Sequence, residues 1–225
     1  MASPPRQLAL ALDHAEKLSR EDFLPGPSNE AALSMVERWP DWPSHTIAIT
    51  GPEGSGKSHL ASIWAQNSGA RVLSARALNT AMLPEALTTG ALVLENCGEG
   101  ALDERAFFHL LNLVREQEAH LLLTARSAPV LWGVALPDLE SRLRAVPAIA
   151  LSMPDDALLR AVTVKLFADR QLAVDENLVA YLLARIGRSF AALQEAVRTL
   201  DREALQRKRP VNRALASELF RDGPA

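Results

Sequence analysis

Five short apolar runs alternate with longer amphipathic segments over the first two thirds of the chain. Runs of this kind, rich in Leu, Ile and Val, are typical of buried strands in a parallel sheet, and spacings of three and four residues between them indicate helices. In residues 103–119, for example, Phe107, Leu110, Leu111 and Val114 recur at helical intervals. The predicted strands are residues 46–50, 71–74, 91–95, 120–124 and 148–151. The predicted helices among them are residues 29–39, 58–65, 103–119 and 136–143, with Asn29 as the capping residue of the first.

After Met153 and Pro154 the strand signal stops and the pattern becomes helical throughout. Helices are expected at residues 155–170, 175–186, 189–207 and 212–220. The sequence therefore predicts an α/β fold with a parallel sheet, followed by a small all-helical domain. The expected divisions are an N-terminal peptide and linker at residues 1–20, an α/β domain at 21–153 and a helical domain at 154–225.

The first predicted strand leads directly into a glycine-rich motif that precedes a helix. The motif consists of Gly51, Pro52, Glu53, Gly54, Ser55, Gly56, Lys57 and Ser58. It fits G-x-x-x-x-G-K-[ST] at every fixed position, and strand, loop and helix are the context that supports a phosphate-binding loop. Backbone N–H groups would surround the phosphates, Lys57 would reach the β- and γ-phosphates, and Ser58 would ligate Mg²⁺. His59, in the first turn of the helix, is a further candidate contact to the nucleotide.

Composition and charge narrow the class of protein. The chain has 225 residues, 48% hydrophobic and 23% charged, which is enough for one large domain or two small ones with a core. The net charge of −3 disfavours a strongly basic nucleic-acid binder. The single cysteine, Cys97, excludes an intramolecular disulfide and a cysteine-based metal cage. No signal peptide and no membrane-length apolar run is found, so a cytoplasmic protein without a membrane partner is expected.

The third predicted strand ends in an altered acidic motif, Leu94-Glu95-Asn96. In phosphate-loop enzymes an Asp at the end of a neighbouring buried strand holds the Mg²⁺ shell, and a following acid often polarises the attacking water. Glu95 keeps a negative charge, but Asn96 is neutral and cannot act as a general base. Hydrolysis by this chain alone is therefore expected to be slow or absent. The alternative is that residues 92–94 are only a core strand and that the acid lies elsewhere.

Two other strand or helix ends carry candidate phosphate ligands. Thr124 ends the fourth predicted strand, where a polar group can sense a γ-phosphate, and Arg126 can pair with phosphate or with an acidic neighbour. Arg142 and Arg144 lie at the end of the helix before the last strand. An arginine supplied to another molecule's nucleotide accelerates phosphoryl transfer by about 10³–10⁵. From spacing alone, a solvated surface arginine is the more common outcome.

The N-terminal segment contains Gln7, Leu8, Leu10 and Leu12. In an extended chain the three leucines project to one side, and with the leading amide they have the form of a docking peptide. An edge strand, or an N-terminus tucked against the core, explains the same pattern equally well.

Together these motifs resemble the DnaA-related AAA+ ATPases, and within them the Hda-type regulators in their alphaproteobacterial form, over essentially the whole chain. Residues 23–29, beginning Phe23-Leu24, resemble the family's nucleotide-base loop, and residues 51–58 resemble its Walker A motif. Residues 92–96 stand at Walker B, 123–126 at sensor 1 and 188–193 at sensor 2. Residues 141–143, Ser-Arg-Leu, resemble the family's Ser-Arg-[Phe/Leu] segment, which makes Arg142 the arginine-finger candidate. Residues 7–12 are similar to the family's clamp-binding peptide, with Ala11 in place of a proline.

The chain departs from the family pattern at three places. Asn96 stands where Walker B normally has its second acid, and sensor 1 lacks an Asp. The sensor 2 arginine falls on Ala191, with Arg188 one turn earlier as a substitute. These changes weaken γ-phosphate sensing and hydrolysis by the chain's own site, so the resemblance implies ADP in preference to ATP. Mg²⁺ would be held indirectly through Ser58 and Glu95.

The resemblance implies a negative regulator of the initiation of chromosome replication. Its partners would be the DNA polymerase III sliding clamp (the beta subunit), bound through residues 7–12, and DnaA, whose ATP hydrolysis Arg142 would stimulate in trans. Self-association into a homo-oligomer is also implied. The chain ends after the helical segments without a helix-turn-helix, so no direct sequence-specific DNA binding is expected. The rival interpretations are an autonomous ATPase related to helicase loaders, a clamp-binding adaptor with a structural nucleotide and, more weakly, a small-molecule kinase.

Overall fold

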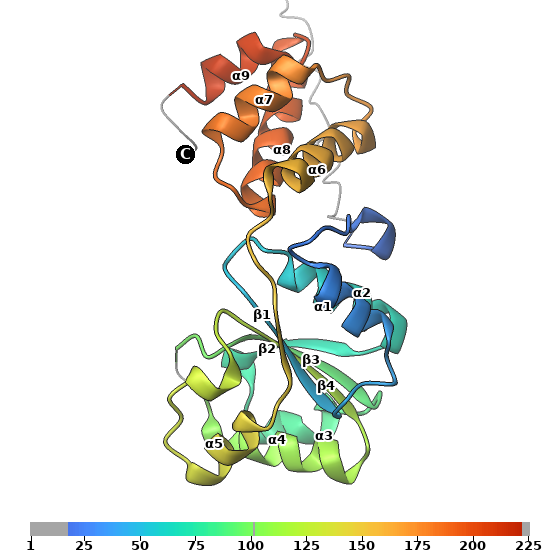
Figure 1. Ribbon diagram of the computed structural model, residues 1–225, viewed down its shortest axis with the longest axis vertical. Helices are drawn as coiled ribbons and strands as arrows, with labels where there is room; N and C mark the ends of the chain where they lie inside the picture. Colours follow the sequence, from blue (N-terminus) through green and yellow to red (C-terminus); the bar gives the residue numbers. More distant parts are fainter. Residues whose placement is uncertain (1–17, 101, 222–225) are drawn as a thin grey trace, which may run out of the picture. The chain divides into compact units, whose positions relative to one another are not determined.

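The computed structural model describes residues 18–100 and 102–221. They form two compact units, Leu18–Pro154 and Asp155–Ala225, the second described as far as Arg221. The first unit is an α/β domain with helices on both faces of one sheet, and the second is entirely helical (Figure 1).

Among the described residues, the sheet of the first unit contains five strands, all paired in parallel, in the order β2-β3-β4-β1-β5. The strands are β1 (Thr46–Thr50), β2 (Arg71–Ser74), β3 (Ala91–Cys97), β4 (His120–Ala125) and β5 (Ala148–Ala150). All five predicted strands are confirmed to within two residues at their ends. Because the strands are parallel, the segments that follow β1, β3 and β4 meet at one edge of the sheet, where the candidate site lies.

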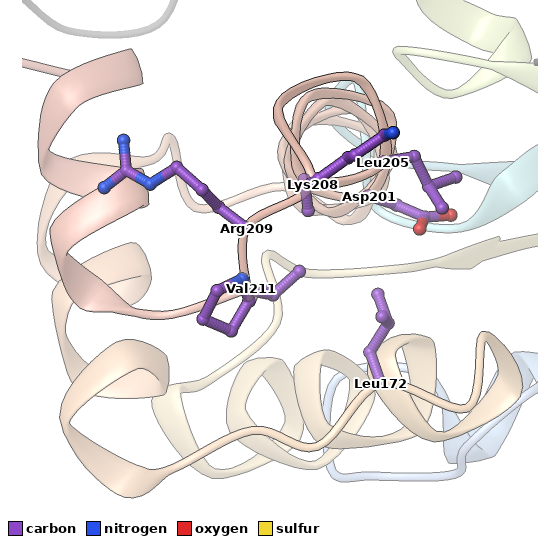
Figure 2. Close-up of a pocket in the computed structure, with 8 residues that line it drawn as sticks. Leu172, Asp201, Leu205, Lys208, Arg209 and Val211 are labelled. Carbon is purple, nitrogen blue, oxygen red and sulfur yellow. The ribbon is translucent and has the colours of Figure 1, made fainter.

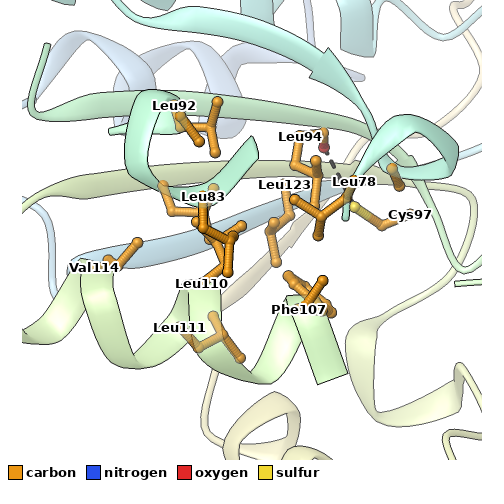
Figure 3. Close-up of a cluster of buried hydrophobic side chains, with 14 of the residues drawn as sticks. Leu78, Leu83, Leu92, Leu94, Cys97, Phe107, Leu110, Leu111, Val114 and Leu123 are labelled. Carbon is orange, nitrogen blue, oxygen red and sulfur yellow. Dashed lines mark hydrogen bonds between the residues drawn. The ribbon is translucent and has the colours of Figure 1, made fainter. Parts of the chain in front are cut away.

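Alternate strand residues face opposite sides of the sheet, and both sides are covered (Figure 1). Ile47, Ile49, Val93 and Leu122 pack with helices α1 (Glu30–Glu37) and α2 (Lys57–Ser68). Leu92, Leu94, Leu121 and Leu123 pack with the helices of the other face (Figure 3). Those helices are α3 (Leu83–Ala86), α4 (Glu104–Glu116) and α5 (Pro137–Arg144). Each buried apolar side chain stabilises the fold by about 1.5–3 kcal/mol. The helix layers on both faces of the sheet therefore hold the strands, and with them the edge that carries the candidate site, in place.

Several short elements were not predicted from the sequence. They are helix α3 and the single 3₁₀ turns Arg20–Asp22, Ala75–Ala77, Thr80–Met82 and Pro129–Leu131. Three or four residues are too few to produce a helical period, so these segments read as loops.

The second unit comprises α6 (Asp156–Asp169), α7 (Glu176–Arg185), α8 (Phe190–Arg207) and α9 (Arg213–Leu219). Each begins with a side-chain cap, in which Asp155, Asp175, Ser189 or Asn212 accepts a hydrogen bond from a backbone N–H two or three residues inside the helix. Such caps contribute about 1 kcal/mol each and explain why the helix starts could be predicted. Among the helices of the described ranges, none is long and apolar enough to cross a membrane.

Candidate functional site

The glycine-rich loop adopts backbone conformations that require its glycines. Gly51, Gly54 and Gly56 have φ values of 151°, 75° and 99°, in the region that side chains other than glycine rarely adopt. A Cβ atom on Gly51 would lie 2.6 Å from the carbonyl oxygen of Leu151, the residue after β5. The loop therefore connects the end of β1 to the first residue of α2, Lys57, with its backbone closely packed against the sheet edge.

The Lys57 ammonium folds back over this loop. Its Nζ donates hydrogen bonds to the carbonyl oxygens of Gly51 at 2.9 Å and Pro52 at 2.8 Å. Burial of the ammonium is the main cause that lowers the pKa of Lys57 below its ordinary value, since desolvation disfavours the charged form. Two carbonyl oxygens of the loop therefore hold a partly desolvated cation at the glycine-rich loop.

The end of β3 is distorted at the altered acidic motif. The register with β4 shifts between Leu94 and Cys97, and Asn96 has a left-handed φ of 59°. Asn tolerates this conformation better than most residues. The Asn96 N–H donates to the Thr124 hydroxyl oxygen at 3.2 Å. The buried Thr124 therefore supports the bulge that positions Glu95.

The strand order could not be assigned from the sequence. In the sheet β4 lies between β3 and β1, so the acidic strand is one strand away from the strand that enters the loop. Strand order depends on long-range pairing, which local patterns do not encode. Glu95 still exerts an electrostatic effect on Lys57, and it is the weakest of the four charged neighbours that do so.

Arg126, just after β4, is paired with two carboxylates from different loops. Its Nη2 lies 2.7 Å from Glu53 Oε2 in the phosphate-binding loop, and its Nε lies 2.8 Å from Glu99 Oε1. The sequence predicted either phosphate or an acidic neighbour as the partner of Arg126. The structure shows two acidic neighbours, and one of them, Glu53, lies in the glycine-rich loop itself.

Glu99 was not singled out from the sequence, and its position is determined by packing. Gly98 has a φ of 73°, and a Cβ atom there would lie 2.6 Å from Cδ1 of Trp132. The Trp132 Nε1–H in turn donates to the carbonyl oxygen of Ser127 at 3.0 Å, and Arg76 Nε donates to that of Glu99 at 3.3 Å. The Gly-Glu-Gly turn directly after a buried strand was the available signal.

The loop expected to bind the nucleotide base begins with a buried Phe23, whose ring meets that of His59 edge-on at 5.1 Å. His59 Nε2 also lies 2.8 Å from the carbonyl oxygen of Ser19. Asn29 precedes α1, but the expected side-chain cap was wrong. Its Oδ1 accepts from the Gly26 N–H at 2.8 Å, and its Nδ2 donates to the Leu24 carbonyl oxygen at 3.1 Å. These bonds hold the turn of residues 24–29 and use both polar groups of the Asn29 side chain.

Arg142 lies on α5 and stacks on α4. Its guanidinium carbon is 4.9 Å from the centroid of the Phe108 ring. Among the described residues, no carboxylate lies within ion-pair distance of Arg142, whereas the neighbouring Arg144 pairs with Glu140 at 2.7 Å. Next to this stack, Phe108, Leu136, Pro137 and Asp138 line a small cavity of about 140 Å³.

The remaining predicted residues are Arg188, the N-terminal peptide, Ser58 and Glu95. Arg188 belongs to the helical unit, where its Nη2 lies 2.5 Å from Asp156 Oδ1, and its role toward nucleotide stays a prediction. Gln7, Leu8, Leu10 and Leu12 lie outside the described residues. Ser58 is exposed and Glu95 half-buried, and the described ranges contain no group of three or more His, Cys, Asp or Glu placed to hold a metal.

The helical unit contains a surface cavity of about 350 Å³ (Figure 2). Its lining residues are Leu172, Asp201, Ala204, Leu205, Lys208, Arg209, Pro210 and Val211. The Arg209 guanidinium points away from the cavity and is paired with Glu218 at 2.9 Å. This arrangement offers an apolar hollow without convergent catalytic groups.

Comparison with solved structures identifies the fold. Domain III of the Thermotoga maritima replication initiation protein DnaA has a TM-score of 0.75 and 18% identity, covering 93% of this chain and 98% of that chain. The replication initiator DnaA bound to AMPPCP and single-stranded DNA has a TM-score of 0.70 and 21% identity, covering 86% and 68%. The Thermotoga maritima RuvB Holliday junction branch migration motor has a TM-score of 0.69 and 14% identity, covering 90% and 72%. No protein-family model and no curated protein sequence matches the chain. The chain therefore has the fold of DnaA domain III, which confirms the predicted fold class of a parallel α/β core followed by a helical unit.

Proposed function

We propose that this chain is an Hda-type negative regulator of replication initiation, which docks on the DNA polymerase sliding clamp and stimulates ATP hydrolysis by DnaA. The observation that carries the proposal is the contrast between two arginines on α5. Arg144 is neutralised by Glu140, whereas Arg142 is half-exposed and held on an aromatic ring. A guanidinium that is oriented by stacking and has no carboxylate partner among the residues of the described ranges can stabilise charge on another protein's phosphates.

The chain's own site binds an adenine nucleotide, with ADP preferred over ATP. The phosphate-binding loop has the required glycine conformations, and Lys57 is positioned over it. The DnaA structure with similar fold was obtained with AMPPCP bound, which supports an adenine nucleotide. Phe23 and Leu24 would contact the base, and Arg188 is retained as a candidate for a further phosphate contact. Mg²⁺ would be shared by Ser58, Glu95 and phosphate oxygens.

Hydrolysis in this site is slow because its base is missing. Asn96 occupies the position of the second acid, and its amide cannot accept the proton of an attacking water. Thr124, the candidate γ-phosphate sensor, already accepts the Asn96 N–H. The bound nucleotide would consequently control the conformation and self-association of this chain, and its hydrolysis would not drive a cycle of work.

The clamp contact is assigned to Gln7, Leu8, Leu10 and Leu12. A short extended peptide with alternating leucines and a leading amide can place its side chains into apolar pockets of a partner. The partners of the assembly would be the beta clamp on DNA and DnaA carrying ATP, in the bacterial cytoplasm.

The test reconstitutes the assembly. Clamp loaded on primed DNA, DnaA carrying labelled ATP, and this chain are mixed, and the conversion of the label to ADP is followed. Stimulated conversion should require all three components and should be lost when the clamp is left out. Gln7→Ala should lower the affinity for the clamp and the stimulation together. Stimulation that persists at full strength without the clamp would refute the docking role.

A further inference from the structure

The guanidinium of Arg126 bridges two acidic side chains over the phosphate-binding loop. Nη2 pairs with Glu53 at 2.7 Å and Nε with Glu99 at 2.8 Å. Glu53 belongs to the loop between β1 and α2, Arg126 follows β4, and Glu99 follows β3. The ion triad, Glu53–Arg126–Glu99, thus ties together the three segments that meet at this edge of the sheet.

The triad lies at the phosphate-binding loop, beside the lysine of that loop. A phosphate-loop lysine reaches the β- and γ-phosphates, so groups that act on Lys57 are near the region these phosphates would occupy. Among the charged side chains that act on the pKa of Lys57, Glu99 has the largest effect, followed by Arg126 and Glu53. All three members of the triad therefore lie within electrostatic reach of the β- and γ-phosphate region.

The charges of the triad should affect the binding of nucleoside diphosphates and triphosphates differently. Two carboxylates and one guanidinium leave a net charge of −1 beside Lys57. The β-phosphate can be satisfied by the loop N–H groups and Lys57. A γ-phosphate adds negative charge next to Glu53 and Glu99, and the arginine that could neutralise it is already held by both carboxylates.

The two carboxylates differ in how firmly they are held. The Glu99 side chain is 27% exposed, and its turn is fixed by the Gly98–Trp132 contact and by Arg76. The Glu53 side chain is 80% exposed, and Arg126 is its ion-pair partner. Glu53 is therefore the partner that a phosphate can replace, while Glu99 keeps Arg126 in position.

We propose that the ion triad sets the preference of this site for nucleoside diphosphate, and that a γ-phosphate binds only by displacing Glu53 from Arg126. The proposal rests on the proposed nucleotide site and adds the residues that determine which nucleotide it retains. Arg126 is a specificity-determining residue in this account, and Glu99 is its positioning residue.

The test compares the dissociation constants for ADP and for a non-hydrolysable ATP analogue, both with Mg²⁺. Glu53→Gln and Glu99→Gln should each shift the ratio of the two constants about 3- to 10-fold toward the triphosphate, a change of roughly 0.7–1.4 kcal/mol. Arg126→Ala should shift it toward the diphosphate. Glu85→Gln is the matched control, since it removes an exposed carboxylate whose partner is Arg71 of β2, and should leave the ratio unchanged.

Equal changes in both constants for Glu53→Gln and Glu99→Gln, or an unchanged ratio for Arg126→Ala, would overturn the triad as the selector. The DnaA stimulation assay separates this outcome from the proposed function. If the variants leave the ratio of the two dissociation constants unaltered while the chain stimulates DnaA normally, only the triad proposal is refuted. A chain that shows the predicted ratios without stimulating DnaA removes the regulatory role alone, and a chain that binds neither nucleotide removes both.

Discussion

The Arg142 guanidinium stacks on the Phe108 ring, with 4.9 Å between the guanidinium carbon and the ring centroid. The contact joins α5 to α4 and holds the arginine without a carboxylate partner among the described residues. Cation–π contacts contribute about 0.5–1 kcal/mol at exposed sites and keep the guanidinium donors available for another ligand. Phe108 thus orients the proposed finger while leaving its charge free to act.

Replacing Phe108 should weaken the finger without removing it. Phe108→Leu keeps an apolar side chain but loses the ring face, so stimulation of DnaA hydrolysis should fall about 2- to 5-fold, equivalent to roughly 0.5–1 kcal/mol. Phe108→Tyr keeps the ring and should retain the stimulation. The rate of ADP formation on DnaA measures both. If leucine performs as well as phenylalanine, the stack has no role in orienting Arg142.

Restoring the missing acid should restore hydrolysis in the chain's own site. Asn96→Asp preserves the shape of the side chain, and Asp also tolerates the left-handed φ of 59°. A positioned general base typically contributes 10²–10⁴-fold, so ADP formation by the purified chain should rise by at least about 10-fold. Asn96→Gly, which tolerates the same φ without supplying an acid, should stay at the wild-type level. An aspartate variant as slow as the glycine variant would show that Asn96 is not what limits hydrolysis.

The turn that carries Glu99 should depend on the absence of a side chain at Gly98. Gly98→Ala would place a Cβ atom 2.6 Å from Trp132 at a φ of 73°. Gly90 has the same φ, but a Cβ atom there would meet no other atom within 4 Å, so Gly90→Ala carries the backbone strain alone. We expect Gly98→Ala to lower the free energy of unfolding by about 1–3 kcal/mol more than Gly90→Ala in urea titrations. Equal losses would mean that the Trp132 contact is not tight.

Stability should fall in mildly acidic solution because of His120. Burial is the main cause that lowers the pKa of His120, and the neighbouring His45 lowers it further. The unfolded chain therefore binds a proton near pH 6.5 while the folded chain does not, so stability is present above that pH and decreases as the pH falls toward the lower folded pKa. Urea unfolding at about pH 7.5 and about pH 5.5, on either side of the ordinary histidine pKa, should show this loss, and His120→Gln should reduce it. A loss of the same size in the variant would assign the effect to other groups.

Local sequence patterns predicted much of the fold but few of the contacts in the site. The glycine-rich loop between β1 and α2 could be predicted because its glycines and flanking apolar residues are contiguous. The caps at Asp155 and Asp175 could be predicted because they act over three residues. The position of β4 between β1 and β3 could not be predicted, because strand order depends on pairing between distant segments. The Glu99–Arg126 ion pair spans 27 residues and was missed for the same reason.

The central claim concerns Arg142, and single-turnover hydrolysis of ATP on DnaA tests it most directly. The assay contains clamp on primed DNA and compares the wild-type chain with Arg142→Ala and Arg144→Ala. Arg144 lies on the same helix but is paired with Glu140, so its loss removes only an exposed i,i+4 pair worth about 0.3–0.5 kcal/mol. An arginine acting in trans contributes about 10³–10⁵ in rate, so Arg142→Ala should abolish the stimulation while clamp binding and the Arg144→Ala variant stay near wild type. Stimulation by Arg142→Ala at the wild-type rate would contradict the account.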